Sequence, residues 1–333
     1  MIDMNDKGII LAVPDNDLGN YKQEISRRPQ IFQMILFNGS FEVIHTAKGK
    51  KKDRICPCIV VPMRDAEELC KREAQSTGSF MTVCVVSSLE MRILKEKRDL
   101  YTYILENRGA RETVSLLADF WKYRAAGGML SKRLISSYIS HKLLILSGGN
   151  DNCVGPSSYD LALGDEYYYG GRLYTLNEKQ PFLQIDPYDY AIVSSAEIVN
   201  MPRDISGRFD ISVSLFCQGI IMSNGTQVDP GFCGKLFCLL FNTSNEPVYL
   251  KRGAHFVTME FCKLLEETEP YDGKYNYQTS IVPYIPPNAL QGGINELKQE
   301  IDKMKKENDR LQSVFLGILS LVIALIALLV TIQ

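Results

Sequence analysis

The chain has 333 residues, of which 45% are hydrophobic and 23% charged, a globular composition with room for two domains. Its formal net charge of −2 excludes the broad basic surface that nonspecific nucleic-acid binding requires, so no nucleic-acid partner is expected. The opening stretch "MIDMNDKGIILAVPDND" is acidic and its apolar run is short, which does not fit a secretory signal peptide.

Residues 1–125 alternate short apolar runs with amphipathic stretches. Strands are expected at "GIILAVP", "FEVIHTA", "CIVVP" and "FMTVCVVSS", and helices at residues 18–36, 63–74, 89–107 and 112–126. This alternation predicts a small α/β domain with a largely parallel sheet. The domain carries no phosphate loop or nucleophile elbow, so the sequence does not indicate its function.

Nine cysteines are scattered along the chain, most of them inside apolar runs, where a free cysteine behaves as a small hydrophobe. Cys56 and Cys58 in "CPC" are one residue too close for the usual metal or redox spacing, and no second pair completes a site. We therefore expect reduced thiols, no metal site and no resident cofactor.

Residues 128–282 change to many short strands separated by turn signals, as in "GDEYYYGGRLYTL" and "FNTSNEPVYLKRG". This spacing predicts an all-β barrel or sandwich. Residues 283–293, which contain proline and glycine, follow as a linker.

A heptad repeat then predicts a parallel coiled coil over residues 294–313, and its seam continues into the segment that follows. Glu300 and Lys305 take g and e positions, where neighbouring copies can pair them. Asn308 at an a position favours two strands. The a and d positions are Ile294, Leu297, Ile301, Met304, Asn308, Leu311, Phe315 and Ile318.

The last segment, "VFLGILSLVIALIALLVTI" at residues 314–332, has no charged residue. At ~1.5 Å per residue, a helix of this length spans roughly the ~30 Å hydrocarbon core of a bilayer. Lys303, Lys305, Lys306 and Arg310 precede it. By the positive-inside tendency, we expect a single-pass C-terminal transmembrane helix with the bulk of the chain in the cytoplasm. A buried core helix is the alternative.

Four motifs occur in the order "MLSKRLISSYI", "GPSSYDLALGDEYYYGG", "VNMPRDISGRF" and "VDPGFCGKLFCLLFN". Together they resemble the dCTP deaminase branch of the dUTPase-like superfamily, over about residues 128–285. The resemblance implies a distorted all-β barrel, a homotrimer and nucleotide sites at the subunit interfaces. Three copies differ from the two that Asn308 favours, so the number of copies stays open.

The resemblance also implies nucleotide-binding residues. Asp229 lies where the family has the aspartate that holds the deoxyribose, and a turn residue that bonds its own backbone is the alternative. The stretch "PYDGKYNYQ" at residues 270–278 resembles the family's closing segment, in which Tyr271, Lys274 and Gln278 reach the base and the phosphates. An exposed connecting strand is the alternative there.

Two elements that the family uses for catalysis and phosphate binding are changed. Leu239 stands where the family has the glutamate that activates water, and leucine cannot take a proton, so no catalytic residue is assigned. In "ISVSLFCQG", Ser212 and Cys217 stand at two arginine positions, and Ser214 remains as a phosphate contact. Ser212 stays a candidate nucleotide contact. Losing bidentate cationic donors weakens the binding of a triphosphate.

These features predict a membrane-anchored oligomer whose dCTP deaminase-like domain is catalytically impaired and serves as a nucleotide sensor or an assembly scaffold. The alternative is an active deoxynucleotide hydrolase, either a dCTP deaminase producing dUTP or a dUTPase-like pyrophosphatase. Mg²⁺ would then enter with the triphosphate, Asp210 or Glu246 would supply the base, and Arg208 or Lys235 would supply positive charge. In a third hypothesis, the N-terminal domain is an effector that the barrel clusters.

Overall fold

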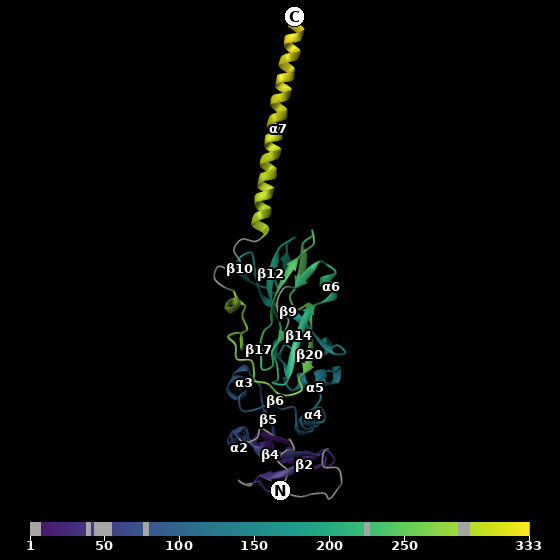
Figure 1. The fold of residues 1–333 in the computed structure, drawn as a ribbon, viewed down its shortest axis with the longest axis vertical. Coiled ribbons are helices and arrows are strands. Elements are labelled where there is room, and N and C mark those ends of the chain that lie inside the picture. Colours follow the sequence, from purple (N-terminus) through teal and green to yellow (C-terminus); the bar gives the residue numbers. More distant parts are fainter. Residues whose placement is uncertain are drawn as a thin grey trace.

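The computed structural model describes residues 8–37, 41–42, 55–75, 80–222, 227–285 and 294–332. Three parts follow one another along the long axis of the molecule (Figure 1). An α/β domain lies at the N-terminal end, an all-β barrel occupies the middle, and one long helix points away from the barrel.

The N-terminal domain is a six-stranded sheet in the order β3-β2-β4-β1-β5-β6, parallel except for the β2–β3 pair. β1 and β4 are buried along almost their whole length because helices cover both faces of the sheet. The strands are β1 (Gly8–Val13), β2 (Phe32–Phe37), β3 (Phe41–Glu42), β4 (Cys56–Pro62), β5 (Phe80–Val86) and β6 (Tyr103–Glu106). The helices are the 3-10 helix η1 (Asp15–Asp17), α1 (Leu18–Ser26), α2 (Met63–Gln75), α3 (Met91–Lys97) and α4 (Ala110–Lys122).

For two of the expected helices in this domain, the prediction is wrong for the second half of the segment. The helix expected over residues 18–36 ends at Ser26, and its apolar end forms β2. The helix expected over residues 89–107 ends at Lys97, and its end forms β6. A short apolar run does not distinguish a buried strand from a buried helix, and in both places pairing in the sheet decides the outcome. Of the expected strand at "FEVIHTA", the structure describes β3, and residues 43–47 lie outside the described residues.

The barrel is built from antiparallel strands, as the short strands and turns of its sequence indicate. Its largest sheet has the order β15-β18-β12-β9-β20-β14-β16, with β10 beside β9 and β7 beside β20, while β11-β19 and β17-β13-β8 form smaller sheets. The elements are β7 (Gly128–Met129), α5 (Lys132–Ser140), β8 (Leu144–Ser147), the 3-10 helix η3 (Asp151–Cys153), β9 (Ser158–Tyr169), β10 (Arg172–Thr175), β11 (Phe182–Ile185), β12 (Tyr190–Ser195), β13 (Ile198–Asn200), β14 (Ile205–Ile211), α6 (Val213–Phe216), β15 (Ile220–Met222), β16 (Gln227–Val228), β17 (Cys233–Gly234), β18 (Phe237–Asn242), β19 (Val248–Lys251), β20 (His255–Lys263) and the 3-10 helix η4 (Val282–Tyr284).

The α/β domain and the barrel share one hydrophobic core. Tyr103 of β6 stacks on Phe120 of α4 with ring centroids 4.1 Å apart, and Phe120 meets Tyr138 of α5 edge-on at 5.4 Å. All three rings are buried. Because this aromatic row crosses the boundary near residue 125, the two domains are packed as one body.

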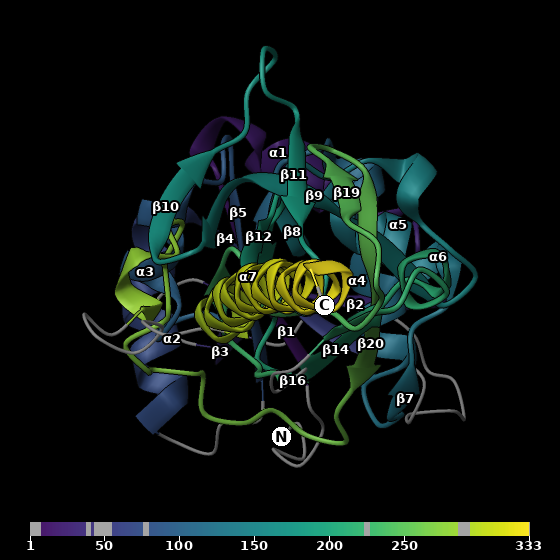
Figure 2. The ribbon, with the colours of Figure 1, turned by 90° about the horizontal axis from the view of Figure 1, so that it is seen from above.

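The helix α7 (Ile294–Ile332) extends the chain away from the barrel, and seen from above it lies over the middle of the body (Figure 2). Met304 and Leu311 of its heptad seam are exposed in the single chain, so the coiled coil stays a prediction. The expected linker falls largely on residues 286–293, which lie outside the described residues.

The expected transmembrane helix is wrong. Among the residues that the structure describes, no helix is long and apolar enough to cross a membrane. Side chains of α7 are described from Glu300 to Ala324, and the uncharged run within that stretch is residues 311–324, shorter than the ~20 residues that a spanning helix needs. This finding also overturns the predictions that depended on the transmembrane helix. They are the membrane anchor, the membrane as a partner, the orientation of the chain and the membrane-anchored scaffold.

Candidate functional site

A cavity of about 310 Å³ opens on the barrel beside the turn that follows β16. It combines one carboxylate, one amine, one amide and several aromatic rings, which are the groups that hold a small ligand with a flat apolar part and a polar part. It is lined by Phe209, Gln227, Val228, Asp229, Phe232, Lys235, Leu236, Phe237, Tyr271, Tyr275 and Tyr284.

The turn at residues 229–234 brings Asp229 into the cavity wall. Gly231 has φ +79°, and a Cβ there would lie 2.4 Å from Cβ of Pro270, so only glycine allows this backbone and this close contact. The side chain of Asp229 is held from its own strand, since Gln227 donates to Asp229 Oδ1 at 2.8 Å. Asp229 therefore has a carboxylate oxygen in a fixed position at the cavity.

Lys235 is the cationic group of the cavity. Its side chain is 15% exposed, and its Nζ lies 2.9 Å from Oδ1 of Asp165 on β9. The hydrogen bond and the charge of Lys235 lower the pKa of Asp165 below its ordinary value, so this carboxylate is ionised at neutral pH. Sequence reasoning considered Lys235 as a source of charge but not its partner Asp165.

Aromatic rings form the apolar side of the cavity. Tyr284 stacks on Tyr275 with centroids 4.3 Å apart and lies 4.5 Å from the ring of Phe237. Phe232 and Tyr271, which also line the cavity, have ring centroids 5.9 Å apart. Desolvation raises the pKa of the Tyr284 hydroxyl, so this ring stays neutral. A planar heterocycle can stack against such rings.

Residues 270–278, called the strap below, cross the turn and close one side of the cavity. The Tyr271 amide donates to the Pro230 carbonyl at 2.8 Å, and the Lys235 amide donates to the Gln278 carbonyl at 2.9 Å. Two of the three expected strap contacts do not line the cavity. Lys274 Nζ lies 4.9 Å from the ring centroid of Tyr275, and the Gln278 side-chain amide donates to the Lys274 carbonyl.

The other expected residues also lie outside the cavity lining. Ser212 and Ser214 hydroxyls are 3.1 Å apart at the start of α6, on the surface. Asp210 accepts a hydrogen bond from the neighbouring Ile211 amide, and Glu246 lies in an exposed turn. The half-buried Leu239 of β18 pairs with Ile192 of β12. Arg208 lines an adjacent cavity of about 280 Å³ together with Gln227.

The antiparallel barrel, its aspartate turn and its closing strap define a dUTPase-like barrel. The sequence model of one family, described as dCTP deaminase-like, matches residues 129–264. The chain belongs to this family, within the dUTPase/dCTP deaminase superfamily.

Curated relatives agree with this membership. The chain is 35% identical to the dCTP deaminase of Pyrococcus horikoshii over 150 residues, which are 45% of this chain and 95% of that protein. It is 37% identical to the dCTP deaminase of Thermococcus gammatolerans over 135 residues, 40% of this chain and 85% of that protein. Among solved structures, the 2'-deoxycytidine 5'-triphosphate deaminase from Agrobacterium tumefaciens aligns at 17% identity with a TM-score of 0.37, over 41% of this chain and 49% of that one.

Proposed function

We propose that residues 128–285 act as a deoxynucleotide hydrolase of the dCTP deaminase class, with a deoxycytidine nucleotide as substrate. The observation that carries the proposal is the cavity that joins Asp229 and Lys235 to an aromatic wall, in a domain whose relatives are named dCTP deaminases. In this proposal a cytosine ring stacks on the aromatic wall to which Tyr284 and Phe232 belong, and the Asp229 carboxylate accepts a hydrogen bond from a ligand hydroxyl.

Hydrolytic deamination adds water to C4 of cytosine, breaks the C4–N4 bond and releases ammonia. The step needs a base that takes a proton from water, and Leu239 offers none. Among the described residues discussed above, two carboxylates are candidates for this base. Asp229 lines the cavity, and Asp165 accepts a hydrogen bond from Lys235, which lines it. We propose that Asp229 accepts a hydrogen bond from the ligand hydroxyl and that Asp165 takes the proton from water. Because Lys235 lowers the pKa of Asp165, this base is weak and turnover is slow.

The test uses the full chain with dCTP, dCMP and deoxycytidine, and it follows both ammonia release and the conversion of the base. We expect ammonia and a deoxyuridine product at a slow rate. Asp229→Ala should weaken binding, and Asp165→Asn should remove turnover while leaving binding in place. Lys251→Met is the control, since Lys251 is an exposed residue of β19 that does not line the cavity. Binding without any ammonia would refute the hydrolase, and absence of binding would refute the whole assignment.

A further inference from the structure

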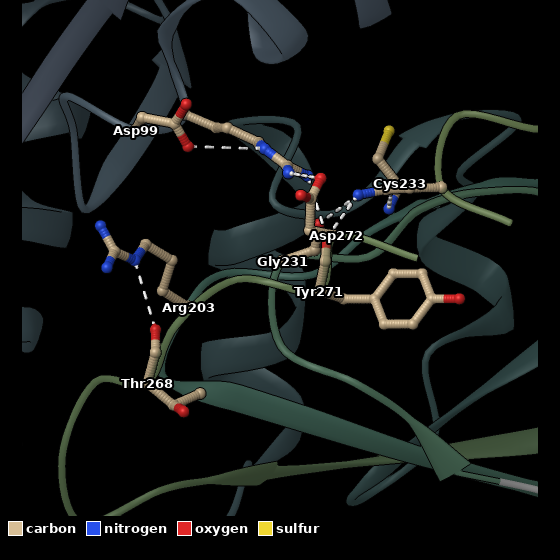
Figure 3. Close-up of polar contacts among 9 residues, drawn as sticks. Asp99, Arg203, Gly231, Cys233, Thr268, Tyr271 and Asp272 are labelled. Atoms are coloured by element: carbon tan, nitrogen blue, oxygen red, sulfur yellow. Dashed lines mark hydrogen bonds and ion pairs between the residues drawn. The ribbon is translucent and has the colours of Figure 1, made fainter. Parts of the chain in front are cut away.

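The strap is held from a second side by the α/β domain. Arg98 directly follows α3 and is separated from the strap by more than 170 residues of sequence. It donates to the Tyr271 carbonyl at 3.0 Å and to Asp272 Oδ1 at 2.8 Å. Figure 3 shows these two strap residues beside Asp99, whose carboxylate lies 3.7 Å from Arg98 Nε.

Arg98 is nearly buried at this contact. Its side chain is 16% exposed, and its guanidinium carbon lies 5.4 Å from the ring centroid of Tyr277, the strap residue on its other side. A guanidinium that makes directed bonds and also stacks on an aromatic ring is fixed in orientation, which a flexible ammonium does not reproduce. Arg98 thus contacts the strap at both Tyr271 and Tyr277.

The Tyr271 carbonyl is one point where the two domains meet. It accepts from Arg98 of the α/β domain and from Asn276 Nδ2 at 2.7 Å within the strap. Asn276 Oδ1 accepts in turn from the Cys233 amide at 2.8 Å, in the turn that carries Asp229 (Figure 3). A displacement of the strap at Tyr271 therefore breaks bonds to the α/β domain and to the aspartate turn together.

We propose that the α/β domain sets the ligand affinity of the Asp229 cavity through Arg98, which acts as a positioning residue for Tyr271. The proposal rests on the proposed function, because it takes the cavity as a nucleotide site. Arg98 does not line that cavity. It bonds to the backbone carbonyl of Tyr271, and the side chain of Tyr271 lines the cavity. A change in the α/β domain that moves the end of α3 would change nucleotide binding without touching the ligand.

The test compares Arg98→Ala with Arg92→Ala in the full chain. Arg92 lies on α3, the helix that Arg98 directly follows, and its side chain is 77% exposed. It forms an ion pair with Glu96 of α3 at 3.7 Å. We expect Arg98→Ala to raise the Kd for dCTP about tenfold, within the roughly 5- to 150-fold range of coupled sites, and Arg92→Ala to leave it unchanged. Arg98→Lys should recover only part of the loss.

Hydrogen exchange supplies a readout that needs no ligand. The Tyr271 and Lys235 amides, which bond the strap to the turn, should exchange faster in Arg98→Ala and not in Arg92→Ala. Asp272→Ala is the second variant, since Asp272 is 92% exposed and its loss removes one Arg98 bond without opening the core. Its Kd should lie between those of the wild type and Arg98→Ala.

The outcomes separate the two proposals. If the wild type binds dCTP and Arg98→Ala binds it equally well, the coupling is refuted and the nucleotide site stands. Unchanged exchange at Tyr271 in Arg98→Ala would refute the positioning role as well. If the wild type binds no nucleotide while Arg98→Ala loosens the strap, the proposed function fails and the control of affinity fails with it.

Discussion

Lys263 and Asp204 form a buried ion pair where the barrel meets the α/β domain. The Lys263 ammonium lies 2.8 Å from Asp204 Oδ2, and the side chains are 8% and 4% exposed. Tyr103 of β6 donates its hydroxyl to the same oxygen. Burial raises the pKa of Tyr103, and the charge of Asp204 adds to the effect. Asp204 Oδ1 has no hydrogen-bond partner among the described residues. The carboxylate therefore depends on Lys263 for its charge balance.

Lys263→Met removes that charge while keeping most of the side-chain volume. Breaking a buried ion pair by removing one partner costs about 3–5 kcal/mol, because the remaining charge is left uncompensated. We expect a loss of that size in the free energy of unfolding at neutral pH. Lys263→Met with Asp204→Asn should lose less than Lys263→Met alone, since no buried charge then remains.

Urea-induced unfolding of the full chain measures this loss through the fluorescence of Trp121, the single tryptophan. Trp121 lines the same cavity of about 60 Å³ as Asp204 and Lys263, so its emission reports on this junction. Lys251→Met, on the exposed side of β19, is the control and should change stability by at most about 0.5 kcal/mol. A loss below about 1 kcal/mol for Lys263→Met, or a double variant less stable than the single one, would refute the reasoning.

Two further predictions concern proton transfer and pH. Leu239→Glu should raise ammonia release from a deoxycytidine nucleotide by about 10²-fold, the low end of what general bases contribute, and a rate equal to that of Leu239→Gln would contradict this. Burial lowers the pKa of His141 below its ordinary 6.5, so below that pH the unfolded chain binds a proton that the folded chain does not. His141 thus lowers stability as pH falls from 6.5 to the folded pKa, and His141→Gln should flatten the decline in urea midpoint between about pH 7 and 5; an unchanged slope would refute it.

The architecture was predictable from the sequence where local pattern and tertiary pairing agree. β1 and β4 are apolar runs of strand length between helices, and they form the centre of the parallel sheet. β2 and β6 were missed because their apolar residues also continue the spacing of the helix before them. Only pairing with β4 and β5 distinguishes the two outcomes, and that information is not local.

The site was predictable only in part for a similar reason. Of the residues that the resemblance singles out, Asp229 and Tyr271 line the cavity and Lys274 and Gln278 do not, while their binding of a nucleotide stays a prediction. Tyr275 lies inside the closing segment but had no role assigned to it, and Tyr284 belongs to no motif. Barrel closure brings Tyr284 to Phe237 and stacks Tyr275 on Tyr284. The Asp165–Lys235 bond joins residues 70 positions apart. Such a contact depends on how the strands pair in the folded barrel, so it cannot be predicted from local spacing in the sequence.

The surroundings of Leu239 determine what a carboxylate there would do. Leu239 shares the half-buried face of β18 with Phe237, which lines the cavity, two residues or roughly 7 Å away. It pairs with Ile192, so a glutamate at 239 would stand in apolar surroundings that raise its pKa above the ordinary ~4.3. Asp165 has the opposite environment, because Lys235 holds its pKa below 3.8.

A base whose pKa lies closer to the working pH transfers protons more effectively, so the glutamate should be the better base of the two. The pH profiles distinguish them. Turnover that depends on Asp165 should be level with pH from about 5 upward, because that carboxylate is already ionised. Turnover by Leu239→Glu should still rise across that range as the glutamate ionises. Coincident profiles for the two proteins would show that neither carboxylate is the base.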